Sequence, residues 1–230
     1  MRNIAIFLLV SLPLCAGFFP QTVQSTVSKV TKDSVVLKKP FPLNGMSGVV
    51  IHRYSDELQA ITHRVIHLSA SHAVLLKGEI IAHDSLPSIN TAVKPGDRVI
   101  GGYLYSNVLL LAPDAKTYAN ITARYQRNWI HPDIFALFLA DEGESIPTRE
   151  NLSKFAKTYQ VGLIAMVGKN SIKLYDPVSA KVIKTKTIKG LPSKTKAPFY
   201  MRFDKIESGW FSKNSEADYY SIIKRFQDAE

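Results

Sequence analysis

The sequence predicts an α+β protein in which a β-rich, barrel- or sandwich-like half comes first and a half that combines helices with a strand meander follows. Between residues 23 and 113, short apolar or alternating runs are separated by turn residues, which is the pattern of strands. From Asp114 onward, apolar residues recur every three to four positions, as in helices. The composition agrees with a folded protein, because 46% of the 230 residues are hydrophobic and 21% are charged.

Residues 1–17 are expected to form a secretory signal peptide. Arg2 precedes an apolar run over residues 4–14, and Cys15-Ala16-Gly17 offers small residues for cleavage after Ala16 or Gly17. The run is shorter than the roughly 20 residues that a membrane-spanning helix needs. We therefore expect export to the periplasm, the outer membrane or the cell surface. The mature chain would have no transmembrane helix and would contact a membrane only peripherally.

Cys15 is the one cysteine of the sequence, and it belongs to this processing region. We therefore expect a mature chain with no disulfide framework, no cysteine-ligated zinc site and no CxxC redox pair. An alternative processing route is lipidation of Cys15, since residues 12–15 have the outline of a lipobox. Against this route, Leu14 stands where a small residue is usual, and Pro13 is atypical.

Six runs in the first half predict six strands of a small antiparallel barrel or sandwich, a β-rich subdomain over residues 23–113. The runs are residues 27–37, 47–54, 58–69, 72–82, 98–103 and 107–111. Turn residues such as Asn44-Gly45 and Ser55-Asp56 separate them. Pro95-Gly96-Asp97 indicates a tight return into a final hairpin, made by the last two runs.

Residues 114–230 are predicted to form an α+β subdomain in which helices precede a meander. Asp114 is a suitable N-cap for a first helix, His131-Pro132-Asp133 begins a second helix that extends through Leu139, and Thr148 opens a third. Strands are expected over residues 161–167, 171–175 and 181–188, and a terminal helix over residues 217–227. The change of period at Asp114 therefore separates the two halves.

Five of the six histidines lie between residues 52 and 83: His52, His63, His67, His72 and His83. This grouping raises the hypothesis of a zinc or copper site. On one strand, however, His63 and His67 lie about 13 Å apart, which makes joint ligation at about 2.1 Å difficult. We interpret the histidines as polar positions on exposed strand faces. A histidine-based metal-binding or catalytic protein stays open as the alternative of another class.

Motifs of known enzyme chemistry are missing from the sequence, which contains no GxSxG elbow, no HExxH, no P-loop and no GxGxxG. His131 and Asp133 place a base near a carboxylate, but Asp133 stands where an acidic residue favours the first turn of a helix. Asp141, Glu142 and Glu144 are interpreted as solvated surface. We predict a protein that is not an enzyme and uses no cofactor.

The positive charge is concentrated toward the C-terminal end. The sequence holds 29 Lys and Arg against 19 Asp and Glu, a formal net charge of +10. Residues 154–205 contain twelve basic residues and two acids, Asp176 and Asp204, so this segment alone carries an equal excess. Its densest part is predicted to be a strand that ends in a mobile basic loop. The candidate binding residues there are Lys181, Lys184, Lys186, Lys189, Lys194 and Lys196.

This basic surface has three interpretations. The first is a site for anionic lipid headgroups or polyanions, and the second is a set of lysines presented to a lysine-recognising protein. The third is a face that only keeps the protein soluble. Nucleic acid is not an expected partner, because export removes the usual target and the sequence carries no DNA- or RNA-reading motif.

Six short sequence segments, called phrases below, occur in a fixed order and resemble the N-terminal family of plasminogen-binding protein A. The phrases are Gly45-Met46-Ser47-Gly48-Val49-Val50, Tyr54-Ser55-Asp56, Gly96-Asp97-Arg98-Val99, Leu110-Leu111-Ala112-Pro113, Val161-Gly162-Leu163-Ile164 and Ala197-Pro198-Phe199-Tyr200. The resemblance covers about residues 43–226. It implies an envelope or surface protein of curved Gram-negative bacteria that binds host plasminogen, whose kringle domains recognise lysine side chains.

The resemblance also implies where such recognition would reside. Family members with this activity continue into a long charged extension that ends in lysine, and a terminal lysine supplies a cation and a carboxylate in one residue. The present sequence ends in Glu230, so Lys189, Lys194 and Lys196 are the internal candidates. We expect an exported, non-enzymatic protein that acts by protein binding, with lysine-mediated plasminogen binding as one form. The alternative is a periplasmic scaffold, for example an accessory protein of the flagellar motor.

Overall fold

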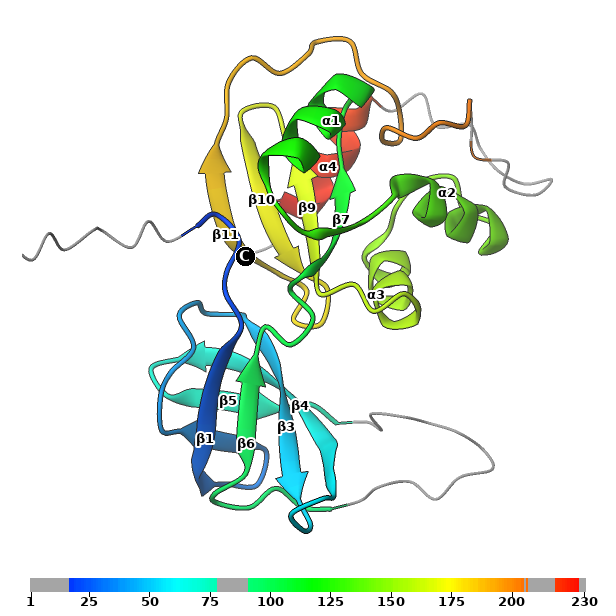
Figure 1. The fold of residues 1–230 in the computed structure, drawn as a ribbon. Helices are drawn as coiled ribbons and strands as arrows, with labels where there is room; N and C mark the ends of the chain where they lie inside the picture. The colour runs from blue at the N-terminus through cyan, green and yellow to red at the C-terminus, as the bar shows by residue number, and fades with distance from the viewer. Residues whose placement is uncertain (1–16, 78–90, 205, 207–217, 228–230) are drawn as a thin grey trace, which may run out of the picture.

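The computed structural model describes residues 17–77, 91–204, 206 and 218–227. Within them, the chain forms a closed β-barrel and a five-stranded sheet covered by helices (Figure 1). The predicted α+β fold class is therefore confirmed. Apart from Gly17, the expected signal peptide lies outside the described residues. None of the described helices is long and apolar enough to span a membrane.

The barrel is built from six antiparallel strands in the order β1-β2-β5-β4-β3-β6. They are β1 (Val23–Val30), β2 (Ser34–Leu37), β3 (Ser47–Arg53), β4 (Gln59–Ser69), β5 (His72–Leu75) and β6 (Arg98–Gly101). The short strand β6 pairs with both β1 and β3, and this double pairing closes the barrel. Small β-branched side chains such as Val27, Val50, Val65 and Val99 are fully buried in its interior, as the alternating sequence pattern requires.

The strand β7 (Asn107–Leu111) corrects one prediction. The expected hairpin between the last two runs of the first half is wrong, because β7 pairs in parallel with β8 (Asn128–Ile130) and β9 (Leu163–Val167) in the second sheet. Two physical reasons account for this. Leu109, Leu110 and Leu111 are each fully buried, which suits a strand covered on both faces. The closed barrel also offers no free edge for a seventh strand.

The second sheet has the order β11-β10-β9-β7-β8, with β10 (Ser171–Asp176) and β11 (Lys181–Thr187) forming an antiparallel hairpin. The helices are α1 (Ala115–Arg124), α2 (Pro132–Asp141), α3 (Arg149–Thr158) and α4 (Tyr219–Gln227). Their positions confirm the four predicted helices. Asp114 caps α1 by accepting from the Thr117 N–H, and Thr148 caps α3 by accepting from the Asn151 N–H, as expected. The three-residue strand β8 was not predicted.

The two faces of this sheet bury different sets of side chains. Leu109, Leu111 and Ile164 face one core, which they share with α2, α3 and α4. Val108 and Leu110 face the other core, which continues through α1 into the barrel interior. Because successive residues of a strand point to opposite faces, β7 joins both cores. The barrel and the sheet consequently share one continuous hydrophobic core.

The first described residues are fixed to this assembly. Phe18 and Phe19 are buried, and the Phe19 ring packs edge-on against Tyr125 and Trp129. The guanidinium of Arg127 lies over the Phe19 ring at 4.8 Å from its centroid. These contacts hold the segment that follows the expected cleavage site against the helix-covered sheet.

Candidate functional site

Of the six predicted binding lysines, three lie on β11 (Lys181, Lys184 and Lys186). The other three, Lys189, Lys194 and Lys196, lie in the loop after β11, which extends to residue 200. In the strand order, β11 is an edge of the second sheet. Lys181, Lys186, Lys189 and Lys194 are exposed, whereas Lys184 and Lys196 are half-buried. Figure 1 shows this orange segment running from the end of β11 over the sheet toward the C-terminal helix. The lysines therefore lie along one continuous segment of the chain but differ in their surroundings.

Lys184 and Lys186 contact the N-terminal segment. The Lys184 Nζ donates to the Gly17 carbonyl at 2.9 Å. The Lys186 Nζ donates to the Tyr125 hydroxyl at 3.1 Å and lies 5.9 Å from the centroid of the Phe18 ring. Both ammonium groups thus have partners within the chain, and they help to fix the first described residues.

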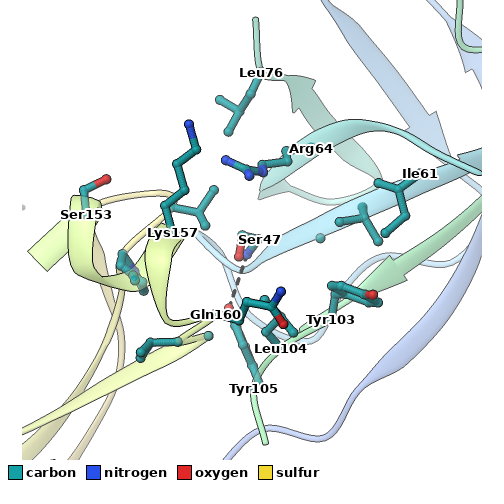
Figure 2. A pocket seen from close by; sticks show the side chains of 17 residues that line it. Ser47, Ile61, Arg64, Leu76, Tyr103, Leu104, Tyr105, Ser153, Lys157 and Gln160 are labelled. Carbon is teal, nitrogen blue, oxygen red and sulfur yellow. Dashed lines mark hydrogen bonds between the residues drawn. The ribbon is translucent and has the colours of Figure 1, made fainter. Parts of the chain in front are cut away.

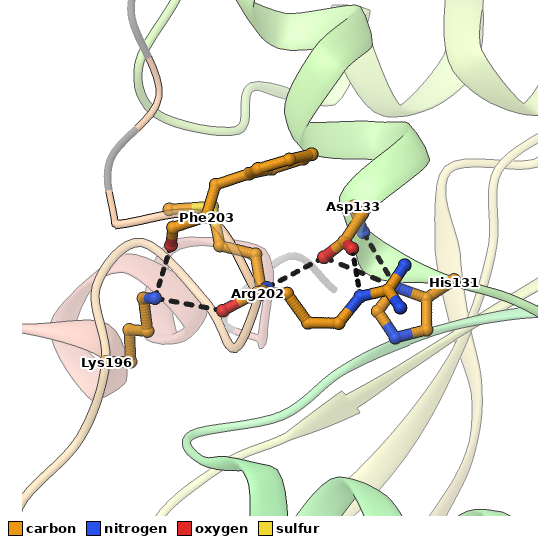
Figure 3. Close-up of polar contacts among 6 residues, drawn as sticks. His131, Asp133, Lys196, Arg202 and Phe203 are labelled. Carbon is orange, nitrogen blue, oxygen red and sulfur yellow. Dashed lines mark hydrogen bonds and ion pairs between the residues drawn. The ribbon is translucent and has the colours of Figure 1, made fainter.

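Lys196 also has partners within the chain. It donates from Nζ to the Met201 carbonyl at 2.9 Å and to the Phe203 carbonyl (Figure 3). Its backbone N–H donates to the Pro113 carbonyl at 2.8 Å. Since the ammonium group closes the turn over residues 196–203, Lys196 has a structural role in the chain itself.

The loop over residues 189–196 is attached to its surroundings at further points. The Tyr220 hydroxyl of α4 donates to the Pro192 carbonyl at 2.8 Å, and the Thr195 hydroxyl lies 3.3 Å from the Asp218 carboxylate. Lys189 and Lys194, by contrast, make no hydrogen bond or ion pair in the described part of the chain. Asp218 is exposed, and its carboxylate contacts Thr195, the residue next to Lys194.

A polar cluster at the start of α2 fixes the turn that follows the basic loop. Asp133 is buried, and its carboxylate accepts from the Arg202 N–H at 2.8 Å and from the Arg202 Nε at 2.5 Å (Figure 3). Burial opposes ionisation of Asp133, but the two bonds from Arg202 together with the nearby positive charges outweigh it and lower the pKa of Asp133. His131 is the residue that caps α2, by accepting from the Asp133 N–H at 3.2 Å. Asp133 lies in the first turn, as expected, but mainly binds Arg202.

The predicted histidine group is divided among several environments. His67 is only 2% exposed, and its ring nitrogens lie 3.0 Å and 2.7 Å from the carbonyls of Leu43 and Ala70. The expectation of exposed strand faces is therefore wrong for His67. His52 contacts Asp97 at 2.7 Å, and His83 lies outside the described residues. Within the described ranges, no three His, Cys, Asp or Glu residues are grouped so that they could hold a metal ion.

Two half-buried histidines, His63 and His131, are expected to make the stability of the protein depend on pH. Burial lowers the pKa of His63, although nearby Asp97 partly offsets this, and its Nδ1 is buried without a hydrogen-bond partner. Burial likewise lowers the pKa of His131. Both groups bind protons more readily in the unfolded chain, where the imidazole pKa is about 6.5. The contribution of these two neutral histidines to stability is thus complete above about pH 6.5, and it is lost as the pH drops through their lower folded pKa values.

We therefore expect the free energy of unfolding to be lower at pH 5 than at pH 7.5, as measured by urea denaturation at both values. The variant His63→Gln should show a flatter pH dependence, since it removes one of the two groups. His72→Gln removes an exposed imidazole and should keep the pH dependence of the wild type. A His63→Gln profile as steep as that of His72→Gln would contradict this assignment.

A buried polar joint connects the barrel with the second sheet. The Asp176 carboxylate at the end of β10 accepts from the Ser47 N–H of β3 at 2.9 Å and from the Tyr105 hydroxyl at 2.5 Å. Burial, together with the charge of Asp176, raises the pKa of Tyr105 far above its usual range, so the phenol stays a proton donor. Neither role was predicted, because in the sequence Asp176 is one of two acids of a basic segment and begins a turn with Pro177, and Tyr105 carries no distinguishing signal.

Next to this joint, a cleft of about 590 Å³ opens between the barrel and α3. Residues of β3 and β4, the turn over residues 103–105 and the end of α3 line it. Figure 2 shows the Arg64 and Lys157 side chains extending from opposite walls, one from β4 and one from α3. Neither residue was predicted, because nothing in the sequence links two basic residues that lie in different halves of the chain.

The fold and these surfaces define an α+β protein with a closed barrel, a helix-covered sheet and a lysine-rich edge strand. The family model described as "Plasminogen-binding protein pgbA N-terminal" matches residues 22–224, and the chain belongs to this family. The resemblance seen in the ordered phrases is therefore confirmed.

Two curated relatives show the same similarity. The chain is 26% identical over 196 residues to Plasminogen-binding protein PgbA of Helicobacter pylori strain J99 / ATCC 700824, and 25% identical to the protein of that name from strain ATCC 700392 / 26695. Each match covers 79% of this chain and 42% of the relative, so the chain spans less than half the length of these relatives. No solved structure matches the chain significantly.

Proposed function

We propose that this chain is an exported, non-enzymatic envelope protein that acts by protein binding, and that lysines of the basic loop bind a lysine-recognising partner such as plasminogen. Membership of the plasminogen-binding family and the names of the two relatives support a protein partner. The observation that carries the proposal is the position of Lys189 and Lys194, which are exposed and have no partner in the described residues.

The contacts of the six lysines indicate which of them act in binding. Lys184 and Lys196 donate to backbone carbonyls of the chain itself, so their ammonium groups would have to give up these bonds to reach a partner. Lys189 and Lys194 carry no such cost. Thr195, the residue next to Lys194, contacts the exposed Asp218 carboxylate, which is therefore our candidate for the accompanying anionic group. A kringle site binds a cation together with a carboxylate, and Lys194 with Asp218 offers both groups.

The double variant Lys189→Gln/Lys194→Gln is expected to weaken plasminogen binding by about tenfold or more, because each charge-assisted contact contributes roughly 1.5–3 kcal/mol. The measurement is surface plasmon resonance with the mature chain immobilised and plasminogen in solution. A free lysine analogue such as 6-aminohexanoate should compete with the wild-type chain for plasminogen. Asp218→Asn should weaken binding less than the double variant, since it removes only the carboxylate.

The matched control is Lys29→Gln/Lys32→Gln, which removes two exposed lysines from the barrel and causes the same change in net charge. It should bind plasminogen as the wild type does. If both double variants lose affinity equally, net charge and not the loop determines binding. Binding that persists in the presence of the lysine analogue would refute the lysine mechanism.

A further inference from the structure

The cleft between the barrel and α3 has a composition that indicates a ligand. Its volume of about 590 Å³ lies in the range of small-molecule sites, and it lies where two lobes meet, which is a frequent position for such sites. Among the residues that the structure describes, its lining includes two cations, Arg64 and Lys157, and no acidic residue. The cleft is thus a positively charged depression next to an apolar interface.

The two cations lack counterions in the described part of the chain. Neither the Arg64 guanidinium nor the Lys157 ammonium makes a hydrogen bond or an ion pair there, although Arg64 is half-buried. The contrast with Lys154 on the same helix is direct, since Lys154 pairs with Glu142 at 2.9 Å and with Glu150 at 3.4 Å. Two unpaired cations on one cleft raise its positive potential, and an anion between them would lower the electrostatic energy.

The remaining walls are largely apolar. Val49, Ile61 and Leu76 line the barrel side, and Ala156, Val161 and Val178 line the side of the second sheet. An inorganic anion would meet the two cations but would leave these walls in contact with water. A ligand that combines an anionic group with an apolar body satisfies both parts of the cleft, because burial of apolar surface adds to the charge-assisted bonds.

We propose that this cleft binds a carboxylate ligand with an apolar body, whose carboxylate is held by Arg64 and Lys157 and whose apolar part packs on Val49, Ile61 and Val178. The planar guanidinium of Arg64 matches a carboxylate with two parallel hydrogen bonds, and Lys157 adds a second positive charge from the opposite wall. The site lies outside β11 and the basic loop, so it is independent of the proposed lysine recognition and is a second binding function.

The test uses octanoate as the probe, with the mature chain in solution and binding followed by two-dimensional NMR. Octanoate is expected to shift the signals of cleft residues such as Tyr103 and Gln160 in a saturable manner. Octanol keeps the apolar body without the charge, and acetate keeps the carboxylate without the body. Both are expected to bind at least about tenfold more weakly than octanoate.

Arg64→Gln and Lys157→Gln should each weaken octanoate binding by at least about tenfold, since each removes a positive charge together with its charge-assisted bonding to the carboxylate. Lys154→Gln is the control, because it removes the same charge from the same helix but does not line the cleft. Equal binding of octanol and octanoate would overturn the anionic part of the proposal. Equal losses in Lys154→Gln and Lys157→Gln, or no saturable shift in the cleft, would overturn the site itself.

Discussion

Replacing Asp176 with alanine is expected to lower the free energy of unfolding by about 4 kcal/mol. The Asp176 side chain is fully buried (0% exposed) and accepts hydrogen bonds from the Ser47 N–H, the Tyr105 hydroxyl and the N–H groups of Val178 and Ser179. Its removal leaves these donors without their acceptor and opens a cavity at the joint. Urea denaturation followed by circular dichroism measures the loss, which corresponds to roughly 8–16 °C in Tm.

Two further variants provide stability losses with which the loss in Asp176→Ala can be compared. Tyr105→Phe removes one donor to Asp176 and should cost about 1–2 kcal/mol. Asp33→Ala removes an exposed carboxylate from the turn between β1 and β2 and should change stability by no more than about 0.5 kcal/mol. If Asp176→Ala were as mild as Asp33→Ala, the joint would not hold the barrel to the sheet.

Gly162→Ala is expected to destabilise the protein by about 3 kcal/mol, the upper end of the usual cost of overpacking. A Cβ at this position would lie 2.1 Å from the Leu104 carbonyl oxygen and 2.2 Å from its carbon. Both atoms belong to the backbone, so no side-chain rotation relieves the clash. The start of β9 and the turn between the barrel and β7 would have to separate. Thermal unfolding of the variant beside the wild type measures this cost.

Gly143→Ala separates this steric effect from the general cost of replacing a glycine. Gly143 has φ of +73°, and a Cβ there would meet no atom within 4 Å. Its replacement should cost about 1 kcal/mol, from the left-handed backbone conformation alone. A Gly162→Ala variant no less stable than Gly143→Ala would show that the approach of Leu104 to β9 is loose.

The local elements of this fold follow from the sequence, because their causes are local. Asp114 and Thr148 cap their helices as expected, since a side-chain oxygen reaches an N–H only three residues away. The short apolar runs over residues 47–54 and 58–69 predicted strands of a barrel or sandwich for the same reason, and they form β3 and β4. The family resemblance was visible as well, because its phrases occur in the order of the chain.

Pairing between distant elements was predicted less well. The run over residues 107–111 reads as a strand in any context, and its unbroken apolar character indicates burial on both faces but does not identify the partner strand. The closure of the barrel by β6 decided this, because it left β7 without an edge there. His67 is a similar case, since its polar character indicated exposure whereas two backbone carbonyls satisfy it in the interior.

The α+β class, the family and the segment in which basic residues gather could all be predicted before any contact was known, since composition, period and order along the chain do not depend on how the chain folds. Which of the lysines have partners within the chain depends on the packed structure. It assigned Lys184 and Lys196 to carbonyls of the chain and left Lys189 and Lys194 exposed. It also brought Arg64 and Lys157 to one cleft. Such outcomes depend on contacts between residues distant along the chain, which exist only once the barrel and the sheet have packed together.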